Sequence, residues 1–396
     1  MSHAGSGRGS VVEVFLVALR LGLTSFGGPV AHLGYFRAEY VERRGWLTDA
    51  EYADAVALCQ ALPGPASSQT GIAIGTARAG YLGGVAAWLG FTLPSALAMG
   101  AFAILLSDSH LADAGWVHGL LIAAVAVVAQ AVWGMTRTLT PDVERAMLAA
   151  AAGAAMLLAP EAWVQVFVLA AAGAYGWLRW RHLDFPASTV VPIETRRRRL
   201  APLWLALFVA LLVGLVLGRA VAAEGSLVAM AEVSTRTGSL VFGGGHVVLP
   251  LLEEGFVPQW VTADEFLAGY GAAQAVPGPL FTFAAYLGAK GADVGGAVLA
   301  LIAIFAPSFL LVWGVGPYWD SLRGQPAVRA ALRGVNAGVV GLLAAALYSP
   351  VITSAVDSVR DAALAVLCAF VLIVWKRPSW LVVLLAAAGG ALVALP

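Results

Sequence analysis

The sequence contains the same series of motifs twice, in the same order, and this duplication limits the folds open to the chain. The matching segments are "RLGLTSFGG" at 20–28 with "RTGSLVFGG" at 236–244, "WLTDAE" at 46–51 with "WVTADE" at 260–265, and "QALPGP" at 60–65 with "QAVPGP" at 274–279. After these segments, a Gly-Gly pair and a Pro-Ser pair (Pro94-Ser95 and Pro307-Ser308) recur in both parts. The shared order predicts two homologous halves.

Each repeated motif places glycine and proline inside an apolar run. The stretch "VFGGGHVVLP" at 241–250 has three consecutive glycines, and both later motifs contain Pro-Gly-Pro. Proline and glycine disfavour helix, and a broken helix inside a membrane is tolerated only where protein or water satisfies the freed backbone groups. Repeated halves that are interrupted at matching positions are typical of transporters with a site near the membrane midplane.

The composition places the chain in a membrane. Of its 396 residues 60% are hydrophobic and 12% are charged, whereas a soluble protein has about 25% charged residues. Apolar stretches at 116–133, 204–217 and 362–375 approach the ~20 residues that span a bilayer. The predicted fold class is therefore an all-α polytopic membrane protein of two homologous halves, with broken or re-entrant helical hairpins at the FGG and PGP motifs.

The charges around the first break predict that the halves are inverted. Between the break and the Trp-x-Thr motif the first half carries Arg37, Arg43 and Arg44, while the second half carries Glu253 and Glu254 and no basic residue. By the positive-inside rule the first linker is cytoplasmic and the second is external. The halves then have opposite topology in the membrane, and the N-terminus is cytoplasmic.

This topology predicts an N-terminal transporter repeat at 1–185, a basic cytoplasmic linker at 186–199 and an inverted C-terminal repeat at 200–396. The motif segments expected as hairpins or broken helices are 11–36, 50–78, 226–252 and 264–290. The expected full crossings lie near 82–106, 113–136, 146–160, 162–178, 200–222, 293–315, 327–348, 359–375 and 379–395.

Two arginines stand out as candidates for binding an anion. Arg20 and Arg236 each lie six residues before a Phe-Gly-Gly break, in an otherwise apolar or small segment. An ionisable residue there is costly unless it faces a cavity or a partner. Each could pair with a carboxylate, Glu13 or Glu232. Alternatively, the two planar guanidinium groups hold an oxyanion near the pseudo-two-fold axis, because each binds two oxygens and keeps its charge.

The broken helices supply the other half of such an anion site. Helix N-termini present free N–H donors and a partial positive charge, and glycine lets the backbone approach a ligand. The substrate-binding candidates besides the arginines are Phe26, Gly27, Gly28, Gln60, Pro63, Gly64, Pro65, Phe242, Gly243, Gly244, Gly245, Gln274, Pro277, Gly278 and Pro279. The two glutamines bind ligand or cap a freed carbonyl. His32 and His246 are either packing residues or a proton or anion relay.

Several function classes are excluded by motifs that the sequence lacks. It contains no GxxxxGK[ST] phosphate loop, no Cys/His cluster with metal-ligand spacing and no serine elbow or paired carboxylates. The formal net charge of zero argues against a nucleic-acid surface. We therefore expect no enzyme activity, cofactor, metal or nucleic acid, and transport driven by an ion gradient or the membrane potential.

The duplicated "FGGP"/"FGGG" motifs, together with "WLTDAEYADAVALCQALPGP" and "WVTADEFLAGYGAAQAVPGP", resemble the chromate ion transporter (CHR) family in its two-domain, long-chain form. The resemblance covers nearly the whole chain. It implies a multi-pass protein of the bacterial inner membrane that exports chromate and confers chromate resistance, with sulfate as a stereochemical look-alike. The implied partners are chromate or sulfate and the lipid bilayer, and a homodimer is left open.

Two alternatives remain at this stage. The chain could move sulfate or another oxyanion by uptake or exchange, with proton or sodium coupling. It could also be a non-transporting membrane scaffold or a membrane enzyme, although the inverted repeat and the midplane breaks would then have no purpose.

Overall fold

The computed structural model describes residues 9–26, 28–106, 115–159, 162–182, 198–241, 248–322 and 325–393, and these contain helices and no strand. The long helices are α1 (Val11–Thr24), α2 (Gly28–Arg37), α3 (Asp49–Ala61), α4 (Ala66–Leu105), α6 (Gly115–Leu139), α7 (Val143–Leu158), α8 (Ala162–Trp180), α9 (Ala201–Val221), α10 (Leu227–Leu240), α11 (Val248–Phe256), α12 (Ala263–Ala275), α13 (Phe283–Val315), α15 (Pro326–Ala346), α17 (Val359–Ile373) and α18 (Ser379–Val393). The short elements are η1 (Ala38–Arg43), η2 (Arg198–Leu200), η4 (Leu280–Thr282), η5 (Gly316–Tyr318), α14 (Trp319–Leu322), η6 (Leu347–Ile352) and α16 (Thr353–Ala355). The all-helical prediction is confirmed over this part of the chain, while most of the basic linker lies outside it.

Five helical stretches of the described chain are long and apolar enough to cross a membrane. They are Ala66–Leu105, Gly115–Leu139, Ala201–Val221, Leu280–Tyr318 and Pro326–Ala355. Helices α7, α17 and α18 have 16, 15 and 15 residues. They cover most of the crossings expected at 146–160, 359–375 and 379–395, but each has fewer than the ~20 residues that span the hydrocarbon core.

Helix α4 folds back on itself at Ala79 and Gly80, where the backbone leaves helical geometry and Gly80 takes a φ of 72°. The two arms pack without side chains between them, because a Cβ on Gly75 would lie 2.4 Å from the carbonyl oxygen of Gly83. The sequence predicted that a motif segment ends at 78 and that a membrane crossing starts at 82. The structure confirms this boundary.

Helix α13 of the second half has the same construction. Its turn falls at Ala292 and Asp293, and a Cβ on Gly288 would lie 2.1 Å from the carbonyl oxygen of Gly296. Both halves therefore contain a tight helical hairpin whose inner arm follows the Pro-Gly-Pro motif.

The two hairpins point in opposite directions. The last residues of α4 lie beside the turn of α13, because Lys290 Nζ donates to the carbonyl oxygen of Leu106 at 3.3 Å. The end of α13 lies beside the arm that leads to the turn of α4, because Trp313 Nε1 donates to Thr76 Oγ1 at 3.0 Å. The turns thus lie at opposite ends of the bundle, and the predicted inverted arrangement of the two halves is confirmed.

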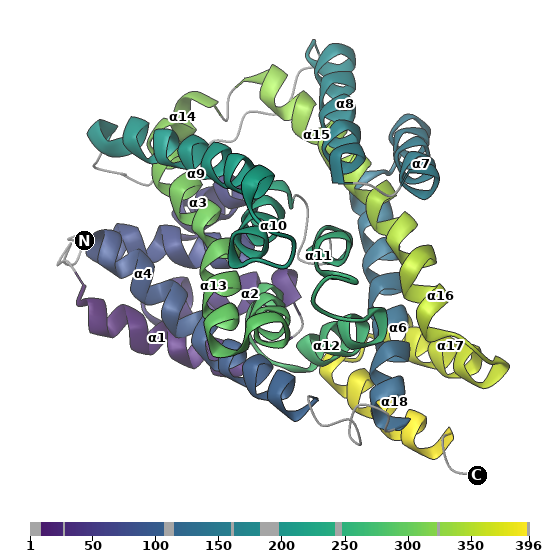
Figure 1. Cartoon of the computed structure of the whole chain (residues 1–396). Helices are drawn as coiled ribbons and strands as arrows, with labels where there is room; N and C mark the ends of the chain where they lie inside the picture. The colour runs from purple at the N-terminus through teal and green to yellow at the C-terminus, as the bar shows by residue number, and fades with distance from the viewer. Residues whose placement is uncertain are drawn as a thin grey trace.

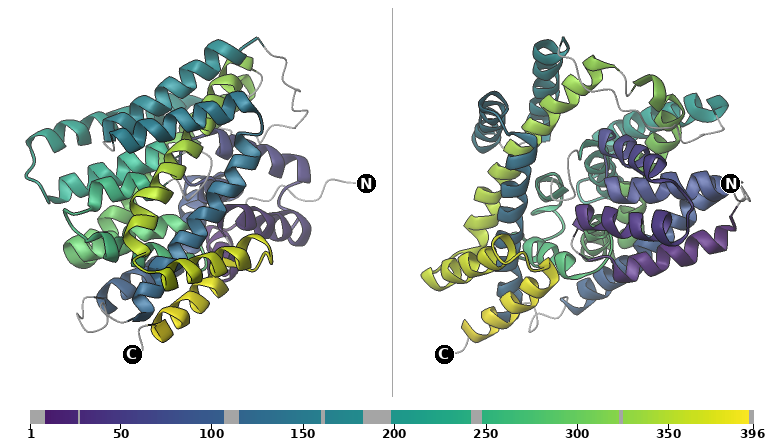
Figure 2. Two further views of the ribbon diagram at one scale, coloured as in Figure 1. Left: turned by 90° about the vertical axis from the view of Figure 1, so that its right-hand side faces the viewer. Right: turned by 180° about the vertical axis from the view of Figure 1, so that it is seen from behind.

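The remaining helices form a scaffold in which the halves exchange partners. Helix α6 of the first half packs on α17 and α18 of the second half, whereas α15 of the second half packs on α7 and α8 of the first. Both contacts use glycine: a Cβ on Gly119 would lie 2.2 Å from the oxygen of Ala386, and one on Gly334 would lie 1.9 Å from that of Ala172. In Figures 1 and 2 this scaffold lies to one side of a motif bundle formed by α1–α4 and α10–α13, and α12 of the bundle lies against α6.

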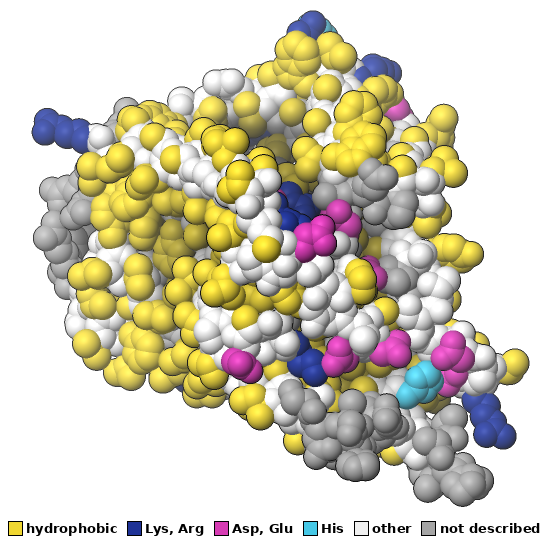
Figure 3. All heavy atoms as spheres, in the orientation of Figure 1, with side chains coloured by type: hydrophobic (Ala, Val, Ile, Leu, Met, Phe, Trp, Pro, Cys, Tyr) yellow, Lys and Arg dark blue, Asp and Glu magenta, His cyan; other side chains and the backbone are white. Residues whose placement is uncertain are grey.

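The outer surface is apolar, as a bilayer requires. Only 6% of the most apolar stretch of α9 is buried within the protein, and side chains such as Leu158 and Val221 are more than four-fifths exposed. On the face in Figure 3 charged side chains are few: acidic ones lie mainly in the middle and along the lower edge, and Lys or Arg side chains also lie at the upper and left edges. Large exposed apolar surfaces of this kind mark contact with membrane or protein.

Substituting Gly119 by Leu should separate α6 from α18, because the new side chain meets the backbone at Ala386. Overpacking of this kind costs about 1–3 kcal/mol, so the melting temperature of the detergent-solubilised protein should fall by several degrees. The matched control is Gly134→Leu on the same helix, where nothing lies within 4 Å of an added Cβ. Equal melting temperatures for the two variants would contradict the close packing.

Candidate functional site

The two Pro-Gly-Pro loops and the two Phe-Gly-Gly breaks meet at one place between the halves. The Gly64 N–H donates to the carbonyl oxygen of Val241 at 2.7 Å, and the Gly278 N–H donates to that of Ser25 at 2.9 Å. Ser25 and Val241 correspond, since each immediately precedes the Phe-Gly-Gly of its half. The central N–H of each loop thus donates to a backbone carbonyl group that lies at the helix break of the opposite half.

Glycine is required at the centre of each loop. The φ angles of Gly64 and Gly278 are 124° and 106°, a region that side chains rarely adopt. Space is also lacking, because a Cβ on Gly64 would lie 2.9 Å from Ser308 Oγ and one on Gly278 would lie 2.8 Å from Ser95 Oγ. The serines of the recurring Pro-Ser pairs therefore line the loops, again across the halves.

Several of the buried polar atoms that have no hydrogen-bond partner in the described chain belong to residues in or near these loops and breaks. These atoms are Ser25 Oγ, His32 Nε2, Ser68 Oγ, Gln69 Oε1, Thr92 Oγ1, Gln274 Nε2 and Ser308 Oγ. An unpaired buried polar group costs about 1–3 kcal/mol, and such groups commonly mark a site for water, an ion or a ligand. The group is uncharged and rich in hydroxyls that can donate to an oxyanion.

His32 belongs to this site. Its ring is 1% exposed, Nδ1 lies 3.3 Å from Ser67 Oγ, and the ring meets Phe91 edge-on at 5.3 Å. The carbonyl oxygen of Phe91 in turn lies beside Gly278, 3.3 Å from where a Cβ would be. The structure thus places His32 within the layer that surrounds the second loop.

Arg20 pairs with a carboxylate of its own half. Its Nη1 atom lies 3.7 Å from Glu39 Oε2, and the side chain of Arg20 is 57% exposed. Glu39 is nearly buried and also binds Arg43 at 3.0 Å and Arg44 at 2.7 Å. The partner is therefore Glu39, whereas the sequence suggested Glu13 for a structural pair.

Arg236 also pairs inside its own half. Its Nε donates to Glu232 Oε1 at 2.9 Å, and Nη1 lies 3.5 Å from Glu254 Oε2. The Glu232 pair is the structural alternative that the i−4 spacing suggested. The ion pairs observed for Arg20 and Arg236 are thus separate, and they hold each guanidinium against its own carboxylates.

The other predicted site residues that the structure describes lie in the two loops or next to the first break. Pro63 accepts a hydrogen bond from Gln69 Nε2 at 2.6 Å, Pro65 caps the start of α4, and the ring of Phe26 lies 6.1 Å from that of Trp380. Gly28 begins α2 with a φ of 77°, while Pro277 and Pro279 flank Gly278 in the second loop. Gly27, Phe242, Gly243, Gly244, Gly245 and His246 lie outside the described residues.

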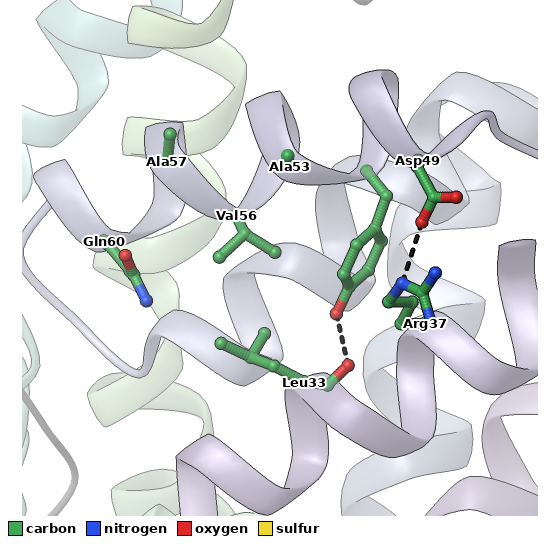
Figure 4. Close-up of a pocket in the computed structure, with 8 residues that line it drawn as sticks. Leu33, Arg37, Asp49, Ala53, Val56, Ala57 and Gln60 are labelled. Atoms are coloured by element: carbon green, nitrogen blue, oxygen red, sulfur yellow. Dashed lines mark hydrogen bonds and ion pairs between the residues drawn. The ribbon is translucent and has the colours of Figure 1, made fainter. Parts of the chain in front are cut away.

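A cavity of about 500 Å³ lies between α2 and α3. Figure 4 shows Gln60 at one end, and at the other Arg37, whose Nε donates to Asp49 Oδ1 at 2.8 Å. Tyr52 donates to the carbonyl oxygen of Leu33 at 2.6 Å across the floor. Gln60, which lines this cavity, is exposed and lies three residues before Pro63 of the first loop.

The sequence predicted Gln274 as a site residue but did not single out the hydroxyls of Ser25, Thr92, Ser95 and Ser308. The Pro-Ser pairs recur in both halves, so their repetition could have indicated Ser95 and Ser308. Ser25 and Thr92 gave no comparable signal, because their positions in the second half hold Val241 and Phe305. No cluster of three or more His, Cys, Asp or Glu side chains that could hold a metal occurs within the described chain.

Inverted halves, helices broken where the halves meet and unpaired donors at that place define a polytopic membrane transporter. The chromate transporter family profile matches residues 12–177 and 228–391, and the chain belongs to this family. No solved structure matches the chain.

Named relatives agree with this membership. The chain is 27% identical to the chromate transport protein of Cupriavidus metallidurans, over 97% of this chain and 93% of the relative. It is 28% identical to that of Pseudomonas aeruginosa, over 85% and 80%. The probable chromate transport protein of Synechococcus elongatus is 28% identical, over 83% of this chain and 81% of its own length.

Removing the unpaired hydroxyl of Ser308 should leave the protein equally stable or more stable. An unsatisfied buried group costs about 1–3 kcal/mol, so Ser308→Ala is expected to keep or raise the melting temperature. The control is Ser239→Ala, since Ser239 is also buried but donates to the carbonyl oxygen of Thr235 at 2.8 Å. That variant loses a hydrogen bond and should melt lower. The reverse order would contradict the assignment of Ser308 to a ligand site.

Proposed function

We propose that this protein is a secondary active transporter that exports chromate across the cytoplasmic membrane and confers chromate resistance. The observation that carries the proposal is the meeting of both Pro-Gly-Pro loops and both breaks, surrounded by unpaired buried hydroxyls and amides. The names of three relatives, two chromate transport proteins and one probable chromate transport protein, suggest the substrate.

An uncharged site suits a dianion that must leave again. Helix α4 begins directly after the first loop and has no side-chain cap, so its first N–H groups and their partial positive charge are available to an anion. Hydroxyls such as Ser25 and Ser308 add donors without adding fixed charge. A tetrahedral oxyanion would bind by hydrogen bonds that are favourable but reversible.

The arginines would act at the border of this site. Arg20 is held by Glu39 at only 3.7 Å, beyond hydrogen-bond distance, which leaves its planar donors available. Arg236 is held more closely by Glu232 and Glu254. A dianion would compete with these carboxylates for the guanidinium groups. It would then pass from one guanidinium group to the hydroxyl and N–H donors of the centre, and from these to the other guanidinium group.

The membrane potential supplies the driving force in this proposal. Moving one charge across the membrane is worth about 2.3 kcal/mol per 100 mV, so a dianion leaving a negative interior gains roughly twice that amount. Export therefore needs no ATP. The basic residues Arg37, Arg43 and Arg44 favour a cytoplasmic first-half end, with the N-terminus on that side.

Sulfate is the second candidate substrate, because it shares the tetrahedral shape and the charge of chromate. A site made of hydroxyls and backbone N–H groups has no feature that separates the two anions. Sulfate uptake or exchange, coupled to protons, would use the same centre in the opposite direction.

Everted membrane vesicles should accumulate labelled chromate, and the accumulation should collapse when the potential is removed. Excess sulfate should compete if both anions bind at the centre. Accumulation that needs a proton gradient and ignores the potential would keep the site and replace the driving force. Absence of any chromate or sulfate movement, in vesicles that contain the folded protein, would contradict the proposed function.

The arginine roles predict that Arg20→Ala and Arg236→Ala each reduce chromate accumulation at least tenfold. Arg179→Ala is the matched control, since Arg179 is exposed and pairs with Glu144 at 2.9 Å on the scaffold. All three proteins are assayed at equal amounts in the membrane. Full transport by both Arg20→Ala and Arg236→Ala would remove these residues from the transport path.

A further inference from the structure

Helices α3 and α12 occupy corresponding positions in the two halves and start in the same way. Each has 13 residues and begins with a capping box, Thr48 with Glu51 in α3 and Thr262 with Glu265 in α12. Each leads into a Pro-Gly-Pro loop. Most of their other residues differ, so the surroundings of the two helices can be compared position by position.

Their corresponding faces differ in exposure. Ala53, Ala57 and Gln60 of α3 are exposed. Their counterparts in α12 are buried: Leu267 is 0% exposed, Gln274 is 9% exposed, and Gly271 is enclosed as well. One face of the repeat is thus open in the first half and closed in the second.

The scaffold closes the α12 face. Helix α12 packs on α6 and α18, and a Cβ on Gly271 would lie only 2.3 Å from the carbonyl oxygen of Leu120 in α6. Ser379 Oγ at the start of α18 donates to the carbonyl oxygen of Gln274 at 3.2 Å. In contrast, the same face of α3 lines the cavity between α2 and α3 (Figure 4).

The hydrophobic core follows the same division. Aromatic side chains of α12 such as Phe266 and Tyr270 share one cluster with Leu120 and Leu121 of α6. The first-half helices form a separate cluster around residues such as Tyr52. Helix α12 is therefore joined to the scaffold through apolar contact, whereas the apolar side chains of α3 pack on the motif bundle, including Leu311 and Val312 of α13.

The scaffold contains equivalent helix contacts from the two halves. The close contact of Gly119 with Ala386 is repeated by Gly334 with Ala172. By this correspondence, Val335 of α15 is the counterpart of Leu120 of α6. Val335 is half-buried and lies against Gly173 of α8, and the residue of α3 that corresponds to Gly271 is Ala57.

We propose that the cavity between α2 and α3 is the open access path to the central site and that the α12–α6 contact is the closed gate. During transport the first path closes while the second opens. Helix α3 then closes on α15 with Ala57 against Val335, while α12 parts from α6. The inference rests on the proposed function for the identity of the anion, but not for the movement. With the first-half end in the cytoplasm, the structure is the state that loads substrate for export.

The first test compares the two faces by thiol labelling. Both native cysteines, Cys59 and Cys368, are buried, and they are replaced by Ala before single cysteines are added. A hydrophilic maleimide should modify Ala57→Cys at least tenfold faster than Leu267→Cys in resting membranes. Imposing a potential with chromate present should slow the labelling of Ala57→Cys and speed that of Leu267→Cys. Unchanged rates while chromate moves would overturn the exchange.

The second test is a crosslink between Ala57→Cys and Val335→Cys. Oxidation during turnover should join them, stop chromate transport and be reversed by a reductant. The control pair is Ala57→Cys with Leu384→Cys, since Leu384 lies exposed on α18, and it should not crosslink. Continued transport by the crosslinked protein, or transport without any crosslink under oxidation, would overturn the proposal.

A third variant does not depend on cysteine chemistry. Ala57→Trp adds bulk to an exposed position, so the melting temperature should stay unchanged while transport falls at least tenfold. Leu97→Trp at an exposed position of α4 is its control. If the labelling rates of Ala57→Cys and Leu267→Cys change in opposite directions under an imposed potential but neither chromate nor sulfate moves, the result supports the gate movement and contradicts the proposed substrate. If chromate moves with no change in labelling at either face, the result supports the substrate and contradicts the gate movement.

Discussion

The hydrogen bonds that the two halves exchange at the centre are the constraint on which the rest of the structure depends. A helix broken inside an apolar protein leaves N–H and C=O groups without partners, and the bilayer has no water to supply them. Here the Gly64 and Gly278 amides each bind the carbonyl that precedes the opposite break. Neither half can satisfy its own break in this way, so the halves are joined where both are interrupted.

The same dependence between halves recurs in the scaffold, where α6 and α15 each pack on the terminal helices of the other half. Glycine at positions such as 119 and 334 lets these backbones touch. Small residues at such contacts are typical of membrane helices, because close approach there replaces the hydrophobic driving force that water provides for soluble proteins. The result is a symmetric scaffold on which the motif bundle sits asymmetrically, and that mismatch leaves one approach to the centre open.

The sequence predicted the helical hairpins and their boundaries well, because glycine and proline act locally. The turns of α4 and α13 fall where the apolar segments were divided, and the inversion expected from Arg37, Arg43 and Arg44 against the second-half glutamates agrees with the antiparallel hairpins. The arginine partners were harder to predict. Arg236 has the nearby Glu232 that spacing suggested, whereas Arg20 meets Glu39 across a break in the chain, which no helical periodicity indicates.

By itself, the sequence determined that the chain is a duplicated, helical membrane protein with paired breaks, since hydropathy, glycine and proline set those features residue by residue. Only the tertiary structure decided which break meets which loop, which buried polar groups lack partners, and that the face of α12 is closed while that of α3 is open. These properties depend on packing between segments some 200 residues apart in the printed sequence. Two segments that carry the same motifs can occupy different surroundings, because burial depends on the neighbours of a residue as well as on the residue itself.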